Sequence, residues 1–289
     1  MAYYLTPLEL AQVLGVDVET IERWAEEGII PMERLPSGRR RIDRRDVVKV
    51  IRERGLRIAN PDLLGLPDLQ KLEAQYLGNA ETDDELQHAI VIGDAERARG
   101  LTLSMYLAGR SVHELCDGPM ATALHEAGGL WQHTRHGIHL EHRATDVCIQ
   151  AIELLRWLVP LPEPGEAPVA VGGAVPGDPY IVPSLMVAVV LAAHGWREVN
   201  LGPDLPLESL TAAVEHHQPR LIWLSMSVTG LPAELPGKVA SLARQLHEQG
   251  RTLVVGGRVW QPLDEDVPGL RSAASMAELV AIQREILAG

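Results

Sequence analysis

The chain has 289 residues, of which 46% are hydrophobic and 22% are charged, a composition typical of globular proteins with two or three domains. Its longest apolar run, from Val182 to Ala193, is shorter than the roughly 20 residues that a membrane-spanning helix needs. The formal net charge of −13 argues against nucleic-acid binding over the whole surface.

Two features of the sequence indicate a compartment. The residues after Met1 do not form a basic and then apolar leader, which argues against export. The two cysteines, Cys116 and Cys148, are expected to be buried thiols in a reducing environment rather than a disulfide. A cytoplasmic location is therefore expected.

Basic residues are concentrated near one end of the chain. Residues 31–58 carry ten basic and four acidic side chains, although the protein as a whole is acidic. A local basic strip on an acidic protein is typical of a small DNA-binding module on a larger regulatory body. A solvated helix face is the alternative, because charge runs usually lie on such faces.

Two short helices are predicted at the start of the chain. In the first, Thr6 is the N-cap, Pro7 is the first helical residue and Gly15 ends the helix. Asp17 caps the second helix, and Gly28 ends it. Two helices around a glycine-containing turn of this length form a helix-turn-helix motif, whose second helix enters the major groove of DNA.

A wing is predicted after the second helix. Two short extended runs flank a Ser37-Gly38 turn within residues 30–42, and a helix from Asp43 to Leu56 closes the module. The arginines of the wing are expected to lie against DNA phosphates, and the exposed side of the second helix is expected to face DNA. The candidate DNA contacts are Thr20, Arg23, Arg39, Arg40 and Arg41.

Residues 1–58 resemble the winged helix-turn-helix domain of the MerR and excisionase families. The resemblance rests on the order of two capped helices, a basic wing and a closing helix. It implies that this domain binds double-stranded operator DNA.

A helical bundle is predicted from Asp68 to Val159, after a linker at residues 59–66. Glycines interrupt the helical pattern at intervals, which indicates about four main helices joined by short loops. The most informative stretch of this bundle contains Trp131, which nine residues separate from an adjacent acid and imidazole, Glu141 and His142. Such an aromatic plate and Glu-His pair suit the capping of a flat ligand, and a buried tryptophan beside a solvated helix start is the alternative.

Histidines recur at every third residue of this stretch and raise the question of a metal site. A zinc site favours residues four apart with a carboxylate or thiolate, whereas successive members here are rotated by about 60° around a helix. Surface or pocket-rim histidines are therefore favoured, and a zinc or haem site is the alternative. The four residues are His133, His136, His139 and His142.

Apolar strands alternate with helices after a proline-rich hinge at residues 160–168. Strands are predicted at 169–173, 199–201, 221–225 and 252–257, and helices at about 181–195, 207–217, 236–249 and 276–287. This order predicts a doubly wound, flavodoxin-like parallel sheet with its ligand crevice at the carboxyl ends of the strands. Glycine pairs at 172–173 and 256–257 are interpreted as room for a bulky ligand.

Catalytic constellations are not found in the sequence. Neither glycine pair has the GxGxxG spacing of dinucleotide-binding loops. No Ser-His-Asp or Cys-His series falls in suitable loops, so no hydrolytic centre and no enzymatic activity are expected.

Motifs of the bundle and of the α/β segment resemble those of cobalamin-binding regulators. In the bundle they are residues 89–94, residues 107–112, Pro119, Trp131 and Glu141-His142, and in the α/β segment they are residues 201–204, Ser225-Met226-Ser227 and Gly256-Gly257. The resemblance implies that the tryptophan and the Glu-His pair cover the upper face of a corrin ring. It also implies that the serines and the glycine pair line a slot for the nucleotide tail.

One motif departs from that family. The family carries Asp-x-His-x-x-Gly, whose histidine ligates cobalt from below, whereas Asp178, Tyr180 and Pro183 occupy the three positions here. A phenol with its usual pKa near 10 is a poor metal ligand unless tuned. At the upper face, Gln132 stands where light-sensing members hold a second histidine, and His133 would point in another direction.

As a whole the chain resembles the CarH-like, MerR-superfamily cobalamin-dependent photoreceptor repressors. This implies a DNA-binding domain at 1–58, a bundle cap at 68–159 and a Rossmann-like domain at 168–289. It also implies a homo-oligomeric transcription regulator that holds adenosylcobalamin between bundle and sheet, with light sensing as a consequence. The candidate cofactor-binding residues are Trp131, Gln132, His133, Glu141, His142, Asp178, Tyr180, Ser225, Ser227, Gly256 and Gly257. Three alternatives are a regulator that senses another flat or small ligand, a corrinoid methyl carrier and a His-based metal sensor.

Overall fold

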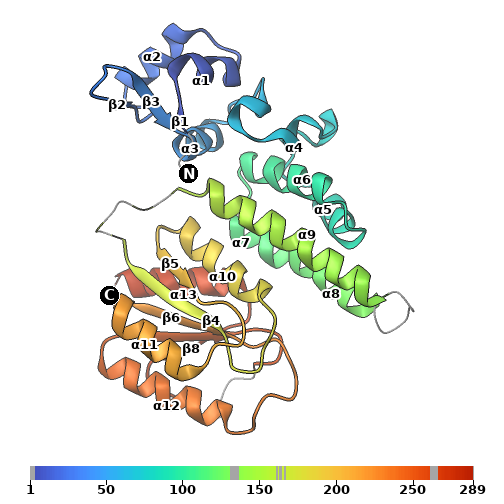
Figure 1. Cartoon of the computed structure of the whole chain (residues 1–289), viewed down its shortest axis with the longest axis vertical. Helices are drawn as coiled ribbons and strands as arrows, with labels where there is room; N and C mark the ends of the chain where they lie inside the picture. Colours follow the sequence, from blue (N-terminus) through green and yellow to red (C-terminus); the bar gives the residue numbers. More distant parts are fainter. Residues whose placement is uncertain are drawn as a thin grey trace. The chain divides into compact units, whose positions relative to one another are not determined.

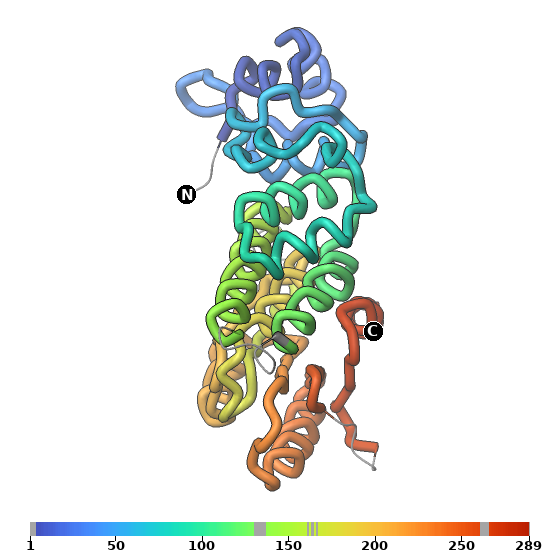
Figure 2. Tube along the Cα trace, turned by 90° about the vertical axis from the view of Figure 1, so that its right-hand side faces the viewer, coloured from blue at the N-terminus to red at the C-terminus, as the bar shows by residue number. Residues whose placement is uncertain are grey.

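The structure, a computed structural model, describes residues 4–130, 137–160, 162, 165, 167–260 and 266–288. The chain divides into two compact units, Met1–Pro160 and Leu161–Gly289. The first unit contains the helix-turn-helix module and the helical bundle, and the second is an α/β domain (Figures 1 and 2). Within the described ranges, no helix has the length and apolar character needed to cross a membrane.

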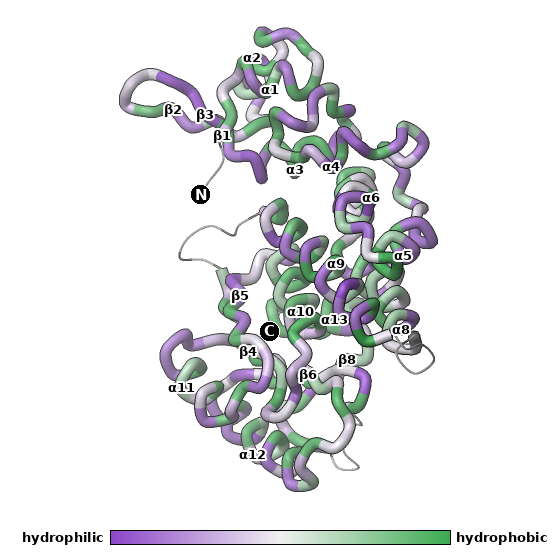
Figure 3. The backbone as a smooth tube through the Cα atoms, turned by 45° about the vertical axis from the view of Figure 1, so that its right-hand side comes forward, coloured by the Kyte–Doolittle hydropathy of each residue, from purple (hydrophilic) through white to green (hydrophobic). Residues whose placement is uncertain are grey.

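The first module is a winged helix-turn-helix. Its elements are β1 (Tyr4–Leu5), α1 (Pro7–Leu14), α2 (Val18–Glu26), β2 (Glu33–Arg34), β3 (Arg40–Asp43) and α3 (Arg44–Arg54). The three strands form an antiparallel sheet in the order β1-β3-β2. The loop that joins β2 and β3 is the wing, and β3 is coloured hydrophilic in Figure 3.

Local capping explains why these helices begin and end where the sequence predicted. The Thr6 Oγ1 accepts a hydrogen bond from the Glu9 amide at 3.2 Å, and the Glu9 carboxylate accepts one from the Thr6 amide at 2.7 Å, which completes a capping box. Gly15 ends α1 in the left-handed region, with φ of 68°. Asp17 caps α2 by accepting from the Thr20 amide at 2.7 Å. The predicted helix-turn-helix is confirmed.

The connection predicted as a linker is packed. The Ala59 amide donates to the Val13 carbonyl at 2.7 Å, and a short 3-10 helix, η1 (Pro61–Leu64), follows. Leu64 and Leu66 are buried, and η1 contacts α1. The connection is therefore part of the core of the first unit.

Four main helices form the bundle, as predicted. The elements from residue 67 to residue 158 are α4 (Pro67–Gln70), η2 (Ala74–Tyr76), α5 (Asp83–Val91), α6 (Ala95–Leu107), α7 (Val112–Leu115), η3 (Cys116–Met120), α8 (Ala121–Leu130) and α9 (Gly137–Leu158). The main helices α5, α6, α8 and α9 pack against one another. Cys116 and Cys148 are free, buried thiols, and burial raises the pKa of Cys148 to about 12.

The second unit is a doubly wound α/β domain with a parallel sheet. Its elements are β4 (Val169–Ala174), α10 (Val182–Ala193), β5 (Arg197–Asn200), α11 (Leu207–His217), β6 (Leu221–Ser225), α12 (Leu235–Glu248), β7 (Thr252–Gly256), β8 (Leu270–Ala273) and α13 (Met276–Ala288). The order β5-β4-β6-β7-β8 has the flavodoxin-like arrangement, and it confirms the predicted fold class. Helices α10 and α13 cover one face, and α11 and α12 cover the other (Figure 1).

Strand β8 was not predicted from the sequence. The strand reads Leu-Arg-Ser-Ala, and its two central side chains are exposed. It lies at the edge of the sheet, where only β7 pairs with it. An edge strand whose two apolar residues stand only at its ends lacks the buried apolar run that identified the central strands.

Candidate functional site

The exposed face of α2 carries the first pair of candidate DNA contacts. Arg23 is exposed, whereas Thr20 is half-buried next to the cap of the helix. Hydrogen bonds from Thr20 and the positive charge of Arg23 lower the pKa of the Asp17 carboxyl. Thr20 therefore takes part in the capping of α2. Arg23 has the longer, exposed side chain on this face and is the better placed of the two to contact a ligand.

The three arginines of the wing have different surroundings. Arg39 is exposed at the turn, and an Arg40 Nη1 lies 3.7 Å from a Glu22 carboxylate oxygen on α2. The Arg41 Nε donates to the Glu33 carboxylate at 2.7 Å, and its guanidinium lies 3.9 Å from the centre of the Tyr4 ring. The sequence analysis gave all three the same role at phosphates, whereas the structure gives Arg41 a bracing contact across β2 and β3.

Of the bundle residues that were predicted to cap a flat ligand, Glu141 and His142 are described, and they lie near the start of α9. The His142 Nε2 lies 3.5 Å from a Glu141 carboxylate oxygen, and the His142 side chain is 75% exposed. The other Glu141 oxygen accepts a hydrogen bond from the Thr145 hydroxyl at 3.4 Å. The pair is thus oriented along the surface of α9. Trp131, Gln132, His133 and His136 lie outside the described residues.

A histidine metal site has no support among the residues that the structure describes. No group of three or more potential metal ligands occurs there. His139 and His142 are both exposed on the first turns of α9.

Hydrogen bonds join three loops at the carboxyl edge of the α/β sheet. The fully buried Asp178, after β4, accepts from its neighbour Tyr180 N at 3.0 Å and from Ser227 N, after β6, at 2.5 Å. The Asp204 amide, after β5, donates to the Asp178 carbonyl at 2.8 Å. An Asp204 carboxylate oxygen accepts from the Gly177 amide at 2.7 Å. Asp178 therefore joins the loop after β6 through one carboxylate oxygen and the loop after β5 through its backbone carbonyl.

Two serine hydroxyls at this edge are buried without a hydrogen-bond partner among the residues that the structure describes. They belong to Ser225, the last residue of β6, and to Ser227, which are 3% and 9% exposed. Buried hydroxyls nearly always have a partner, and each exception calls for an explanation. A bound group with donors or acceptors would satisfy both, which fits the slot implied for a nucleotide tail.

The glycine pairs have a different cause from the one that the sequence analysis gave. A Cβ on Gly257, whose φ is 113°, would lie 2.2 Å from the Met226 carbonyl oxygen, and a Cβ on Gly256 would lie 2.4 Å from the Ala273 carbonyl oxygen. A Cβ on Gly172 would lie 2.2 Å from the Trp223 carbonyl oxygen. The interpretation as room for a ligand is therefore incomplete, because the backbone of the domain itself already requires glycine.

Tyr180 stands at the position of the family's lower axial histidine. Its side chain is 44% exposed, and its amide is bound to Asp178. Asp178 accepts hydrogen bonds from two backbone amides, those of Tyr180 and Ser227.

The sequence analysis missed a buried hydrogen-bond chain beside this edge. The Trp223 Nε1 donates to the Ser184 hydroxyl at 3.0 Å, and that hydroxyl donates to the Asn200 Oδ1 at 2.8 Å. The same oxygen accepts from the Gly202 amide at 3.1 Å. The chain fixes the loop after β5, and its only signal in the sequence was a serine in the otherwise apolar α10.

Two protein-family models match the chain. A helix-turn-helix domain matches residues 4–55, and a B12 binding domain matches residues 82–156, which span α5 to α9. The chain thus combines a helix-turn-helix domain with a B12 binding domain, and these matches support binding of DNA and of cobalamin.

Similar proteins include corrinoid proteins. The dimethylamine corrinoid protein 1 of Methanosarcina acetivorans is 26% identical over 185 residues, which cover 61% of this chain and 83% of the relative. The solved monomethylamine corrinoid protein of Methanosarcina barkeri is 18% identical, with a TM-score of 0.50, and the match covers 70% of this chain and 96% of that protein. The likeness to the solved structure shows the fold that the bundle and the α/β domain share with it.

Proposed function

We propose that the protein is a cobalamin-responsive transcription regulator of the MerR type. Residues 1–58 bind double-stranded operator DNA, and residues 68–159 and 168–289 bind cobalamin. The observation that carries the proposal is the presence of both matched domains in one chain. The unpaired hydroxyls of Ser225 and Ser227 add a place for part of the ligand.

The proposed ligand is adenosylcobalamin. When bound, it supplies a cobalt–carbon bond that green light breaks, so the protein would report light as a change in DNA binding. Glu141 and His142 on α9, with Trp131, Gln132 and His133, are the proposed contacts at the upper face. The tail is proposed to meet Ser225, Ser227 and the Gly256-Gly257 turn, with Asp178 keeping the loops in place.

Tyr180 makes a further part of the proposal testable. Because Tyr180 stands where the motif of the resembled family carries its histidine, we expect cobalamin to be held without a lower histidine ligand from this loop. Tyr180→His should tighten the complex and shift the visible spectrum towards the histidine-ligated form. A histidine-ligated spectrum in the unmodified protein would contradict this expectation.

The decisive experiment mixes the protein with adenosylcobalamin in the dark and removes free ligand by desalting. Corrin absorbance that remains with the protein supports the proposed ligand. A mobility-shift titration of operator DNA, in the dark and after green light, then tests whether the ligand regulates binding. Protein that retains no corrin but binds DNA would favour a regulator for another flat or small ligand.

A corrinoid methyl carrier is the second candidate, because the relatives described above are corrinoid proteins. A carrier has no need for DNA binding. Retained corrin without affinity for any DNA, at low salt as well as at physiological salt, would favour this candidate.

We also propose that the regulator acts as a homo-oligomer. A single module contacts few phosphates, and the affinity of such modules rises when two of them bind half-sites one helical turn apart. Sedimentation of the protein with and without adenosylcobalamin tests this proposal.

A further inference from the structure

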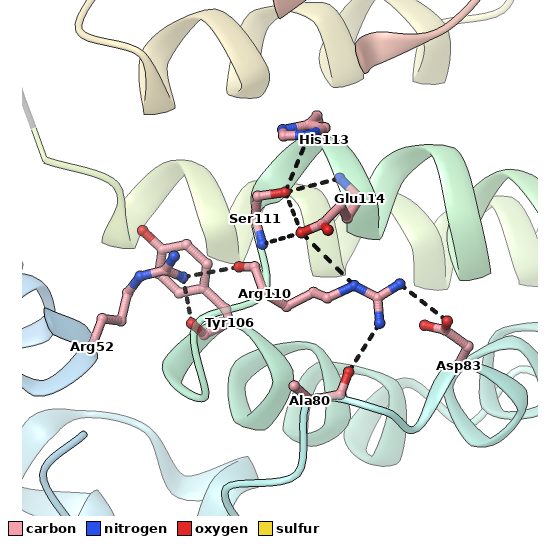
Figure 4. A network of polar contacts seen from close by, with 8 residues as sticks. All are labelled: Arg52, Ala80, Asp83, Tyr106, Arg110, Ser111, His113 and Glu114. Carbon is pink, nitrogen blue, oxygen red and sulfur yellow. Dashed lines mark hydrogen bonds and ion pairs between the residues drawn. The ribbon is translucent and has the colours of Figure 1, made fainter. Parts of the chain in front are cut away.

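Helix α3 of the winged module contacts the carboxyl-terminal ends of two bundle helices through arginines. The Arg52 guanidinium donates to the Tyr106 carbonyl in the last turn of α6 and, at 3.1 Å, to the Arg110 carbonyl in the segment between α6 and α7 (Figure 4). The Arg45 Nε donates to the Trp157 carbonyl at 3.1 Å, one residue before the end of α9. The carbonyls in the last turn of a helix carry the negative end of its dipole, so the Tyr106 and Trp157 carbonyls are favourable acceptors for the two arginines.

The contact at α6 is the more extensive of the two. The Arg52 guanidinium lies 3.6 Å from the centre of the Tyr106 ring, which is buried. Burial lowers the pKa of Arg52, because water is partly excluded from its charge. A planar guanidinium that stacks on a ring and donates to two carbonyls is specific in geometry, and lysine cannot reproduce it.

Arg110 connects this contact to the rest of the bundle. Its guanidinium donates to the Ala80 carbonyl at 2.9 Å and to the Asp83 carboxylate at 3.0 Å, at the start of α5. The next residue, Ser111, caps α7 in a capping box with Glu114 (Figure 4). Arg110 thus links one of the two carbonyls that Arg52 binds to the start of α5 and to the cap of α7.

Helix α9 joins the second contact to the proposed ligand site. Glu141 and His142 lie at its start and Trp157 at its end, sixteen residues after Glu141, which corresponds to about 24 Å of helix. Helices α6 and α9 pack against each other, and α3 touches both. A sliding or rotation of α9 against α6 would thus move the two acceptor carbonyls apart.

We propose that Arg45 and Arg52 form a two-point anchor through which movement of α9 against α6 sets the orientation of the DNA-reading module. The proposal rests on the proposed function, and it assigns the regulation of DNA binding to two positioning residues. In one arrangement of the bundle both arginines are bound and the module is fixed. In the other arrangement one contact is lost, and the module reorients.

The first test does not depend on any ligand. A dye is attached to a cysteine introduced by Glu27→Cys at the exposed end of α2, and its anisotropy decay is measured in the full chain. We expect the module to tumble with the bundle in the otherwise unmodified chain, and to gain a fast component in the Arg45→Met, Arg52→Met double variant. Arg54→Met, which removes an exposed charge from the same helix, is the matched control and should leave the decay unchanged.

The variant Arg52→Lys tests whether the geometry of the guanidinium matters apart from its positive charge. It also guards against a result that is caused by misfolding of the double variant. Lysine keeps the positive charge but lacks the planar guanidinium that stacks on Tyr106. We therefore expect a fast component in the anisotropy decay together with an unchanged circular dichroism spectrum. A decay identical to that of the unmodified chain, in both this variant and the double variant, would overturn the proposed anchor.

The second test measures regulation. The affinity for operator DNA with and without adenosylcobalamin should differ about 5- to 150-fold in the unmodified protein, the usual range of coupling between sites. The ratio should approach one in the double variant, while corrin retention after desalting is unchanged. A ratio that persists in the double variant contradicts the anchor. A ratio of one in the unmodified protein contradicts the proposed function instead, and the anisotropy decay still decides whether the anchor exists.

Discussion

The winged module and the carboxyl edge of the α/β sheet are stabilised by contacts of different range. In the module, Thr6 and Glu9 are three residues apart, as are Asp17 and Thr20, and the hydrogen bonds of both pairs lie at the surface. At the sheet edge, Asp178 binds Ser227 across 49 residues and is fully buried. Because buried polar groups cannot exchange a lost partner for water, the same loss of a hydrogen bond should cost more at the sheet edge than in the module.

The largest effect is expected at Gly257. Gly257→Ala places a Cβ in the left-handed region and against the Met226 carbonyl, so we expect a loss of about 4 kcal/mol from strain and crowding together. The matched control is Gly250→Ala, whose φ is 72° with nothing within 4 Å, and its loss should be about 1 kcal/mol. Urea unfolding followed by tryptophan fluorescence measures both. Equal losses would show that the close approach to the Met226 carbonyl does not contribute to the change in unfolding free energy.

Asp178→Ala should come next. The substitution leaves the buried Ser227 amide and the Tyr180 amide without their acceptor, which should cost about 3 kcal/mol. Asp178→Asn keeps one acceptor oxygen and should lose less. The same urea titration measures the loss of unfolding free energy. A loss as small as that expected for an exposed helix cap would contradict the proposed difference between the two regions.

Thr6→Ala should have a smaller effect. It removes one side of the capping box at an exposed helix start, and such caps contribute about 1 kcal/mol. Hydrogen exchange of residues 7–14 reports the change where it occurs. Thr6→Ser, which keeps the hydroxyl, is the control and should leave the exchange rates of α1 unchanged.

The smallest effects are expected for single wing arginines in DNA binding. If Arg39 meets a phosphate, Arg39→Ala should reduce the salt slope of operator affinity by about one unit. Arg41→Ala should change the slope less, because Arg41 is bound to Glu33 and Tyr4. The triple variant of Arg39, Arg40 and Arg41 should lose up to about three units. Mobility-shift titrations at several salt concentrations measure the slopes, and equal single effects would return Arg41 to the role at phosphates that the sequence predicted.

More of the fold than of the candidate site could be predicted from the sequence. Caps such as Thr6 and Asp17 and the apolar runs of β4, β6 and β7 are local signals, and the predicted helices and central strands followed from them. The edge strand β8 lacked such a signal. The resemblance to a family predicted a binding role for Ser225 and Ser227, which stays a prediction, and the sequence did not predict the hydrogen-bond chain of Trp223, Ser184 and Asn200, whose members are far apart in the sequence.

By itself the sequence determined the order of the modules, because capping, apolar periodicity and charge are properties of neighbouring residues. Only the tertiary structure decided which groups meet across the fold. It showed that Arg52 and Arg45 donate to the Tyr106 and Trp157 carbonyls near the ends of two bundle helices, that Asp178 accepts from backbone amides, and that a side chain at Gly257 would meet the protein's own backbone. Such contacts depend on the approach of segments that are distant in the sequence, and this approach is fixed by packing rather than by local preference.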